Sequence, residues 1–146
     1  MILDRFRLTD RVAIVTGAGR GIGEGCALAF AEQGADVVCA ARTPAQLEAI
    51  AEKIRTLGRR ALVVPCDVKE PGALEALVDR TVAEFGRIDI VVNNAGGTPP
   101  RGALQTSDRM FEAAFHFNVT TAFTLSRHAI PHMQKAGSGS IVNISS

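Results

Sequence analysis

The chain has 146 residues, of which 47% are hydrophobic and 5% aromatic, and its formal net charge is +1. This length suits one domain with its own hydrophobic core. A near-neutral charge, without a basic run or interleaved aromatic residues, excludes the usual nucleic-acid-binding surface. No stretch has the unbroken apolar length of a membrane span, and the first residues lack the apolar segment of a signal peptide, so we expect a cytoplasmic protein.

Strand and helix patterns alternate along the whole chain. Short runs rich in Val, Ile and Ala predict strands at 12–16, 36–41, 61–66, 88–93 and 140–144. Between the strands, helical patterns cover 21–33, 44–57, 71–85 and 107–135. Each helix is followed by a glycine of the kind that ends helices, at Gly34, Gly58, Gly86 and Gly137. Pro44 and Pro71 suit the first turns of the second and third helices.

Apolar strands joined by helices predict the α/β class, with a three-layer, doubly wound parallel sheet of the Rossmann type. Right-handed crossovers then lead to the strand order 3-2-1-4-5. Ligands of such sheets bind where the winding reverses, beyond the carboxyl ends of strands 1 and 4. The glycine-rich loop 96–107 follows strand 4, and we expect it to form either the rim of a pocket or a plain connector.

A glycine-rich turn at 16–23, Thr-Gly-Ala-Gly-Arg-Gly-Ile-Gly, follows the first strand and opens the first helix. Gly17 permits a tight turn, Gly21 leaves room for a pyrophosphate, and Gly23 lets the helix pack against the sheet. The free backbone N–H groups at the helix start point at a bound anion. The spacing is Thr-Gly-x-x-x-Gly-x-Gly, which is neither Gly-x-Gly-x-x-Gly nor the P-loop pattern. We therefore predict one dinucleotide-binding domain over residues 1–146.

Four motifs together carry a family resemblance. The glycine turn is followed by Asn-Asn-Ala-Gly at 93–96, by Asn118 in the long helix and by Ile-Ser-Ser at 144–146. In this order and approximate spacing they resemble the short-chain dehydrogenases/reductases. The resemblance implies an oxidoreductase that transfers a hydride between a nicotinamide cofactor and a small-molecule secondary alcohol or ketone. It also implies a homo-oligomer at full length.

The resemblance assigns roles position by position. It implies that the cofactor contacts Gly17, Gly19, Arg20, Gly21, Ile22, Gly23, Arg42, Asp67, Val68, Asn94, Ala95 and Gly96. Asp67 and Val68 would meet the adenine, and the segment 94–96 would lie beside the ribose nearest the nicotinamide. Asn118 would anchor a water in the proton relay, and Ser146 would orient the substrate oxygen. Asn93 is expected to tie neighbouring strands together.

The end of the second strand indicates which cofactor is bound. An acidic residue there binds a ribose 2′-hydroxyl, whereas an arginine accepts a 2′-phosphate. This chain has Ala41 followed by Arg42, and Arg20 adds a second cation within the glycine turn. We therefore predict NADP(H), with NAD(H) as the alternative if Arg42 is only a solvated residue at a helix entry.

The family's proton-transferring tyrosine, and the lysine four residues after it, have no counterpart here. The chain contains no tyrosine and ends at Ser146, before the position at which the family places that pair. We expect the front part of a longer domain, lacking the family's downstream strands and helices. Without a suitable acid, the 146 residues alone should bind cofactor without turnover. The alternatives are a non-catalytic dinucleotide-binding module or redox sensor and, third, a nucleotide-sugar epimerase.

Residues of the metal-binding types do not predict a metal site. Cys26, Cys39 and Cys66 are odd in number, far apart and embedded in apolar patterns. We expect them to be buried, reduced thiols. His128 and His132 have a helical spacing that suits metal ligands, but a proline separates them and no carboxylate accompanies them.

Overall fold

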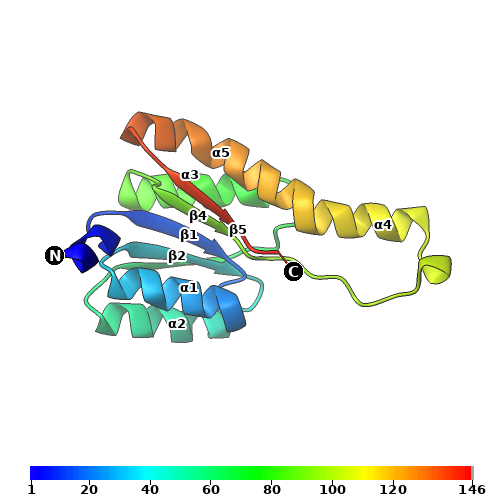
Figure 1. The fold of residues 1–146 in the computed structure, drawn as a ribbon, viewed down its shortest axis with the longest axis horizontal. Coiled ribbons are helices and arrows are strands. Elements are labelled where there is room, and N and C mark those ends of the chain that lie inside the picture. Colours follow the sequence, from blue (N-terminus) through cyan, green and yellow to red (C-terminus); the bar gives the residue numbers. More distant parts are fainter. Residues whose placement is uncertain (146) are drawn as a thin grey trace.

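The computed structural model of the protein describes residues 1–145, which place helices on both faces of one parallel sheet (Figure 1). In chain order the strands are β1 (Val12–Thr16), β2 (Asp36–Ala41), β3 (Ala61–Pro65), β4 (Ile90–Asn93) and β5 (Ser140–Asn143). The helices are α1 (Gly21–Glu32), α2 (Pro44–Thr56), α3 (Ala73–Phe85), α4 (Asp108–Phe115) and α5 (Thr121–Ala136). Three short segments are the 3-10 helices η1 (Ile2–Phe6) and η2 (Ala103–Gln105) and the π-helical η3 (His116–Thr120).

The strand order confirms the predicted doubly wound topology. The five strands lie in the order β3-β2-β1-β4-β5, and every neighbouring pair is parallel. Because the chain passes from β1 outward to β3 and then returns to β4, the winding reverses between β1 and β4. The loops that follow these two strands therefore meet at the carboxyl edge of the sheet.

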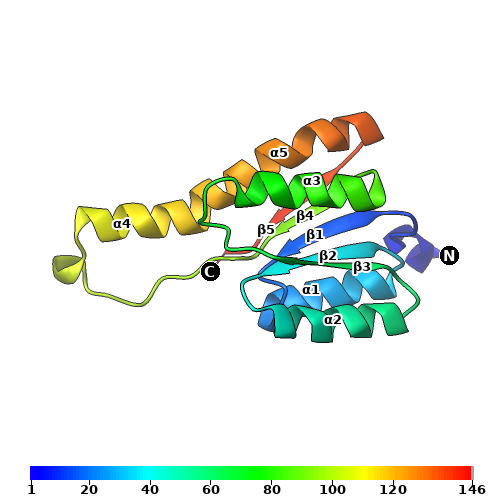
Figure 2. The ribbon, with the colours of Figure 1, turned by 180° about the vertical axis from the view of Figure 1, so that it is seen from behind.

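Alternate residues of the central strands belong to two separate cores. On β1, Val12 and Ile14 pack in the core that includes α3 and α5, whereas Ala13 and Val15 pack in the core that includes α1 and α2. Figure 2 shows these two pairs of helices on opposite faces of the sheet. Both faces of the central strands are buried, which explains their nearly continuous apolar sequence.

β5 forms one edge of the sheet, and its apolar side chains are only partly covered. Ile141 is 38% exposed and Val142 is 41% exposed. Asn93 ties this strand in place, because its Nδ2 donates to Oδ1 of Asn143 at 2.9 Å and to Oγ of Ser126 on α5 at 3.2 Å. This matches the structural role expected for Asn93. No helix within residues 1–145 is long and apolar enough to cross a membrane.

Two helix predictions were wrong in detail. Pro71 lies before α3 rather than in its first turn, because Gly72 takes a left-handed conformation with φ of +76° and the helix begins after it. The long helix predicted at 107–135 is interrupted by η3, so that Asn118 falls in the π-helical turn between α4 and α5. Figure 1 shows α4 and the loop before it extending beyond the sheet.

The amino-terminal edge of the sheet contains two buried aspartates, each held by two arginines. Asp36, the first residue of β2, is 4% exposed. Its Oδ1 accepts from Nη2 of Arg59 at 2.8 Å and from the backbone N–H of Arg60 at 3.0 Å, and its Oδ2 accepts from Nε of Arg60 at 2.8 Å. Burial alone would raise the pKa of Asp36, but these hydrogen bonds and charges outweigh it and lower the pKa.

Asp89, immediately before β4, is held in the same way and is 3% exposed. Its Oδ1 accepts from Nη2 of Arg87 at 2.7 Å and from Nη1 of Arg11 at 3.0 Å. Its Oδ2 accepts from the backbone N–H of Val12 at 2.9 Å. Burial again opposes ionisation, yet the Arg87 hydrogen bond, the Val12 N–H and Arg11 together lower the pKa of Asp89. The carboxylate thereby joins the start of β1 to the start of β4.

Candidate cofactor site

The glycine turn leaves the carboxyl end of β1 and begins α1 at Gly21. Two of its glycines have positive φ, +62° at Gly17 and +58° at Gly21, a conformation that other residues rarely adopt. A Cβ at Gly23 would overlap the carbonyl oxygen of Gly17, whereas a Cβ at Gly21 would meet open space. Gly23 thus lets α1 pack closely beneath the turn, and Gly21 keeps the space above it free.

Hydrogen bonds join the glycine turn to the segment that follows β4. Nδ2 of Asn94 donates to the carbonyl oxygens of Thr16 and Gly17, both at 3.2 Å. The Thr16 hydroxyl donates to the carbonyl oxygen of Val92 at 3.2 Å and accepts from the backbone N–H groups of Asn94 and Ala95, each at 3.0 Å. Through these hydrogen bonds, the Asn94 amide and the Thr16 hydroxyl fix the two loops relative to each other.

A pocket of about 540 Å³ opens between these loops. Of the residues predicted to contact the cofactor, all but Gly23 line this pocket. They are Gly17, Gly19, Arg20, Gly21, Ile22, Arg42, Asp67, Val68, Asn94, Ala95 and Gly96. The structure thus brings together residues from the ends of four strands.

Five further residues line the same pocket and were not predicted: Ala41, Thr43, Gln46, Cys66 and Phe117. Ala41, Thr43 and Cys66 adjoin predicted residues, so their places at strand ends could have indicated them. Gln46 and Phe117 lie within helical patterns, where no motif distinguishes them.

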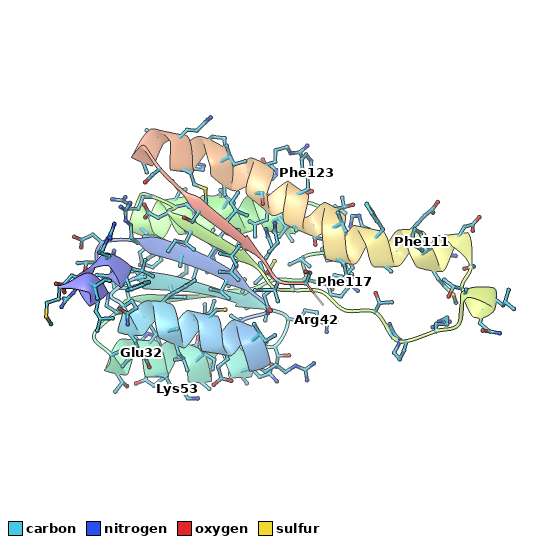
Figure 3. All side chains as sticks on the ribbon, in the orientation of Figure 1. Glu32, Arg42, Lys53, Phe111, Phe117 and Phe123 are labelled. Atoms are coloured by element: carbon cyan, nitrogen blue, oxygen red, sulfur yellow. The ribbon has the colours of Figure 1, made fainter. Side chains whose placement is uncertain are left out.

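Two arginines line the pocket, Arg20 just before α1 and Arg42 just after β2. Arg20 and Arg42 are exposed, and neither forms an ion pair with a carboxylate among residues 1–145. Figure 3 shows Arg42 at the carboxyl end of the sheet. The Thr43 hydroxyl at the start of α2 makes no capping hydrogen bond. Free guanidinium and hydroxyl donors at one place suit a phosphate group.

Asn118 holds the chain that leaves β4. Its Oδ1 accepts from the N–H of Gly97 at 2.8 Å, and its Nδ2 lies 3.1 Å from the Gly97 carbonyl oxygen and 3.2 Å from the Thr98 hydroxyl. π-Helical turns such as η3 occur frequently at functional sites. Ser146, the predicted catalytic serine, lies outside the residues that the structure describes.

The cysteines differ in exposure. Cys39 and Cys66 are buried, as expected, whereas Cys26 is only half-buried. Burial raises the pKa of the Cys39 thiol to about 12 and also raises the pKa of Cys66, which the Asp67 charge raises further. Both thiols are protonated at neutral pH and are weak nucleophiles. Cys66 therefore contributes packing to the pocket wall.

Comparison with known proteins decides the family. The family model for short chain dehydrogenases matches residues 11–146. The chain belongs to the short-chain dehydrogenase family. An uncharacterized oxidoreductase of Mycobacterium tuberculosis is 52% identical over the whole chain, which covers 56% of that protein. The 2-dehydro-3-deoxy-D-gluconate 5-dehydrogenase of Escherichia coli is 40% identical over the whole chain, which covers 57% of it.

Solved structures of this short-chain dehydrogenase family share the fold. A 7α-hydroxysteroid dehydrogenase complexed with NADH and 7-oxo glycochenodeoxycholic acid superposes with a TM-score of 0.94 at 38% identity, covering 98% of this chain and 56% of that one. Carveol dehydrogenase from Mycobacterium avium, in complex with NAD, superposes with a TM-score of 0.86 at 32% identity, covering 92% of this chain and 54% of that one. The chain spans about half the length of the curated relatives it matches.

Proposed function

We propose that the whole protein is an NADP(H)-dependent oxidoreductase that transfers a hydride between this cofactor and a secondary alcohol or ketone. The observation that carries the proposal is the pocket at the carboxyl edge, where Arg20 and Arg42 have no carboxylate partner among the described residues and β2 ends at Ala41. An acidic side chain at that strand end would favour NAD(H) instead. The relatives named above are an uncharacterized oxidoreductase and several dehydrogenases, which supports the reaction class.

In this proposal, different groups of pocket residues bind different parts of the cofactor. The N–H groups of the glycine turn hold the pyrophosphate, and Arg20 and Arg42 hold the 2′-phosphate. Asp67 and Val68 hold the adenine, and the backbone at 94–96 lies along the ribose nearest the nicotinamide. When bound, the cofactor supplies or accepts the hydride.

The proton chemistry needs groups beyond those of the cofactor pocket. Carbonyl reduction places charge on oxygen, so the site requires a polarising group and an acid with a suitable pKa. We assign the first role to Ser146 and the anchoring of the relay to Asn118. The chain has no tyrosine, and none of its serine or threonine hydroxyls is a comparable acid. We infer that these 146 residues bind cofactor without turnover.

An apolar stripe on α4 and α5 supports the proposal that the whole protein forms a homo-oligomer. Phe111, Phe115 and Phe123 are 66%, 54% and 63% exposed. Figure 3 labels Phe111 on α4 and Phe123 on α5. Clustered exposed aromatic residues typically mark an interface.

The cofactor proposal is tested by titrating the whole protein with NADP(H) and NAD(H). We expect tighter binding of NADP(H), by about tenfold to a hundredfold, and Arg42→Ala should reduce this difference without weakening NAD(H). Arg5→Ala is the matched control, because Arg5 is exposed and belongs to η1, away from the pocket. Equal affinities in the parent protein would contradict the NADP(H) assignment. Binding without turnover of any alcohol or ketone would favour the non-catalytic module.

A further inference from the structure

A second pocket lies between the loop after β3, the start of α3 and the first half of α5. Its volume is about 330 Å³, and among residues 1–145 it shares Val68 alone with the cofactor pocket. Figure 2 shows α3 and α5 on the face of the sheet opposite α1 and α2. Six ionisable side chains line this second pocket: Lys69, Glu70, Glu75, His116, Arg127 and His128. The cofactor proposal assigns no role to this cluster.

The lysine and the arginine of the second pocket are both held by aromatic rings. Nζ of Lys69 lies 5.4 Å from the centroid of the Phe117 ring, and Cζ of Arg127 lies 5.6 Å from the centroid of the Phe123 ring. Both distances are within the range of a cation–π interaction. Figure 3 labels the two rings. An aromatic ring positions a cation without neutralising it, so the charge of each side chain stays available to a ligand.

Carboxylates do not neutralise these two cations. Within the part of the chain that the structure describes, neither Glu70 nor Glu75 forms an ion pair, and no carboxylate pairs with the lysine or the arginine of the pocket. Arg60 provides the contrast, because it also lies over an aromatic ring but is paired with Asp36. The cations of the second pocket therefore resemble those of the cofactor pocket rather than those of the amino-terminal edge.

The wall formed by η3 and α5 supplies further hydrogen-bond donors. His116 is exposed, and His128 and Thr124 are half-buried. An imidazole ring carries at least one N–H donor in either protonation form, and a hydroxyl can also donate. Glu70 and Glu75 belong to the opposite wall, in the loop before α3 and in the first turn of that helix. A negatively charged group is thus favoured near the wall formed by η3 and α5.

We propose that the second pocket binds a phosphate group, either free or carried by a small organic molecule, between Lys69 and Arg127. Arginine binds phosphate through paired N–H donors, and lysine binds it as a point charge. The volume is about ten times the share of one water molecule in the liquid, which leaves room for an organic part beside the phosphate. The proposal does not depend on which dinucleotide occupies the cofactor pocket.

The test is a calorimetric titration of the whole protein with inorganic phosphate and with glycerol 3-phosphate at constant ionic strength. It is made in the parent and in an Arg20→Ala, Arg42→Ala background, which weakens competing phosphate binding by the cofactor pocket. In that background we expect both ligands to bind, and Lys69→Met or Arg127→Met should each weaken binding about fivefold. Tighter binding of glycerol 3-phosphate would identify an organic phosphate as the ligand, and equal binding would identify free phosphate.

Three further variants sharpen the test. Glu75→Gln removes a carboxylate from the pocket and should strengthen phosphate binding about twofold. Lys135→Met is the matched control for the lysine, because Lys135 is exposed on α5 and does not line the pocket. Arg109→Met, at an exposed residue of α4 outside the pocket, is the control for the arginine. Both controls should bind phosphate as tightly as the background protein.

Two results would overturn the inference: no phosphate binding in the Arg20→Ala, Arg42→Ala background, or unchanged affinity in the Lys69→Met and Arg127→Met variants. The replaced side chains are exposed, so we expect all variants to fold, and their melting temperatures check this. Failure of the NADP(H) assignment looks different. In that case the parent binds both dinucleotides equally, while the phosphate titrations of the second pocket are unaffected.

Discussion

The arginines at the amino-terminal and carboxyl edges of the sheet differ in whether they are paired with carboxylates. At the amino-terminal edge, Asp36 and Asp89 are each buried and each paired with two arginines. At the carboxyl edge, Arg20 and Arg42 line a pocket without a carboxylate partner among residues 1–145. Arginine side chains thus stabilise the fold at the amino-terminal edge, whereas at the carboxyl edge they are available to bind a ligand. A candidate anion site is therefore marked by cations that lack a carboxylate partner, and not by the presence of cations alone.

The largest effect is expected where the carboxyl edge depends on backbone contact. Gly23→Ala would place a Cβ against the carbonyl oxygen of Gly17. Because this oxygen belongs to the backbone of the glycine turn, it can move away only if the turn opens. We expect the free energy of unfolding to fall by about 3 kcal/mol or more and cofactor binding to be lost.

Gly25→Ala is the matched control, because a Cβ at Gly25, in the same helix, meets nothing within 4 Å. This variant should bind cofactor normally and be as stable as the parent or more stable, by about 0.5 kcal/mol. Denaturant unfolding and cofactor titration check both variants. Normal binding by Gly23→Ala would contradict the geometry of the turn.

The amino-terminal edge can be broken without touching the pocket. Asp89→Ala removes a buried carboxylate and leaves the Val12 N–H and two partly exposed guanidinium groups without it. We expect a loss of about 3 kcal/mol in unfolding free energy, with unchanged cofactor affinity in the folded protein. Asp79→Ala, at an exposed aspartate of α3, should change stability by less than about 0.5 kcal/mol. Weaker cofactor binding in folded Asp89→Ala would show that the edges are coupled.

A smaller effect should appear on acidification. Both Asp36 and Asp89 have pKa values lowered by folding. A carboxyl group with a lowered folded-state pKa contributes stability above its unfolded pKa of about 3.9, and this contribution is lost as the pH falls through the folded-state pKa. We expect unfolding free energy to be steady from about pH 7 to 5 and to fall below about pH 4. In the double variant Asp36→Asn, Asp89→Asn, the free energy of unfolding should fall less below about pH 4 than it does in the parent. An equal fall in both proteins would show that other carboxylates cause the effect.

The same two edges show what the sequence can predict. The glycine turn, the strand order and the convergence of 94–96 with Arg42 follow from local patterns and from the rule that parallel strands end at one edge. The aspartate pairs could not be predicted, because the partners of Asp89 include Arg11, 78 residues away in the chain. Phe117 was missed for a related reason. The residue lies within the helical pattern at 107–135, and that pattern shows no break at the π-helical turn η3, to which Phe117 belongs.

The most direct test of the difference between the two edges is hydrogen exchange of the whole protein with and without NADP(H). We expect slower exchange in segments 16–23, 41–47, 66–69 and 94–97, and around 116–118, with no change in segments 57–61 and 86–90 at the amino-terminal edge. Protection confined to the amino-terminal segments, or no protection at a saturating cofactor concentration, would contradict the assignment of the pocket as the cofactor site.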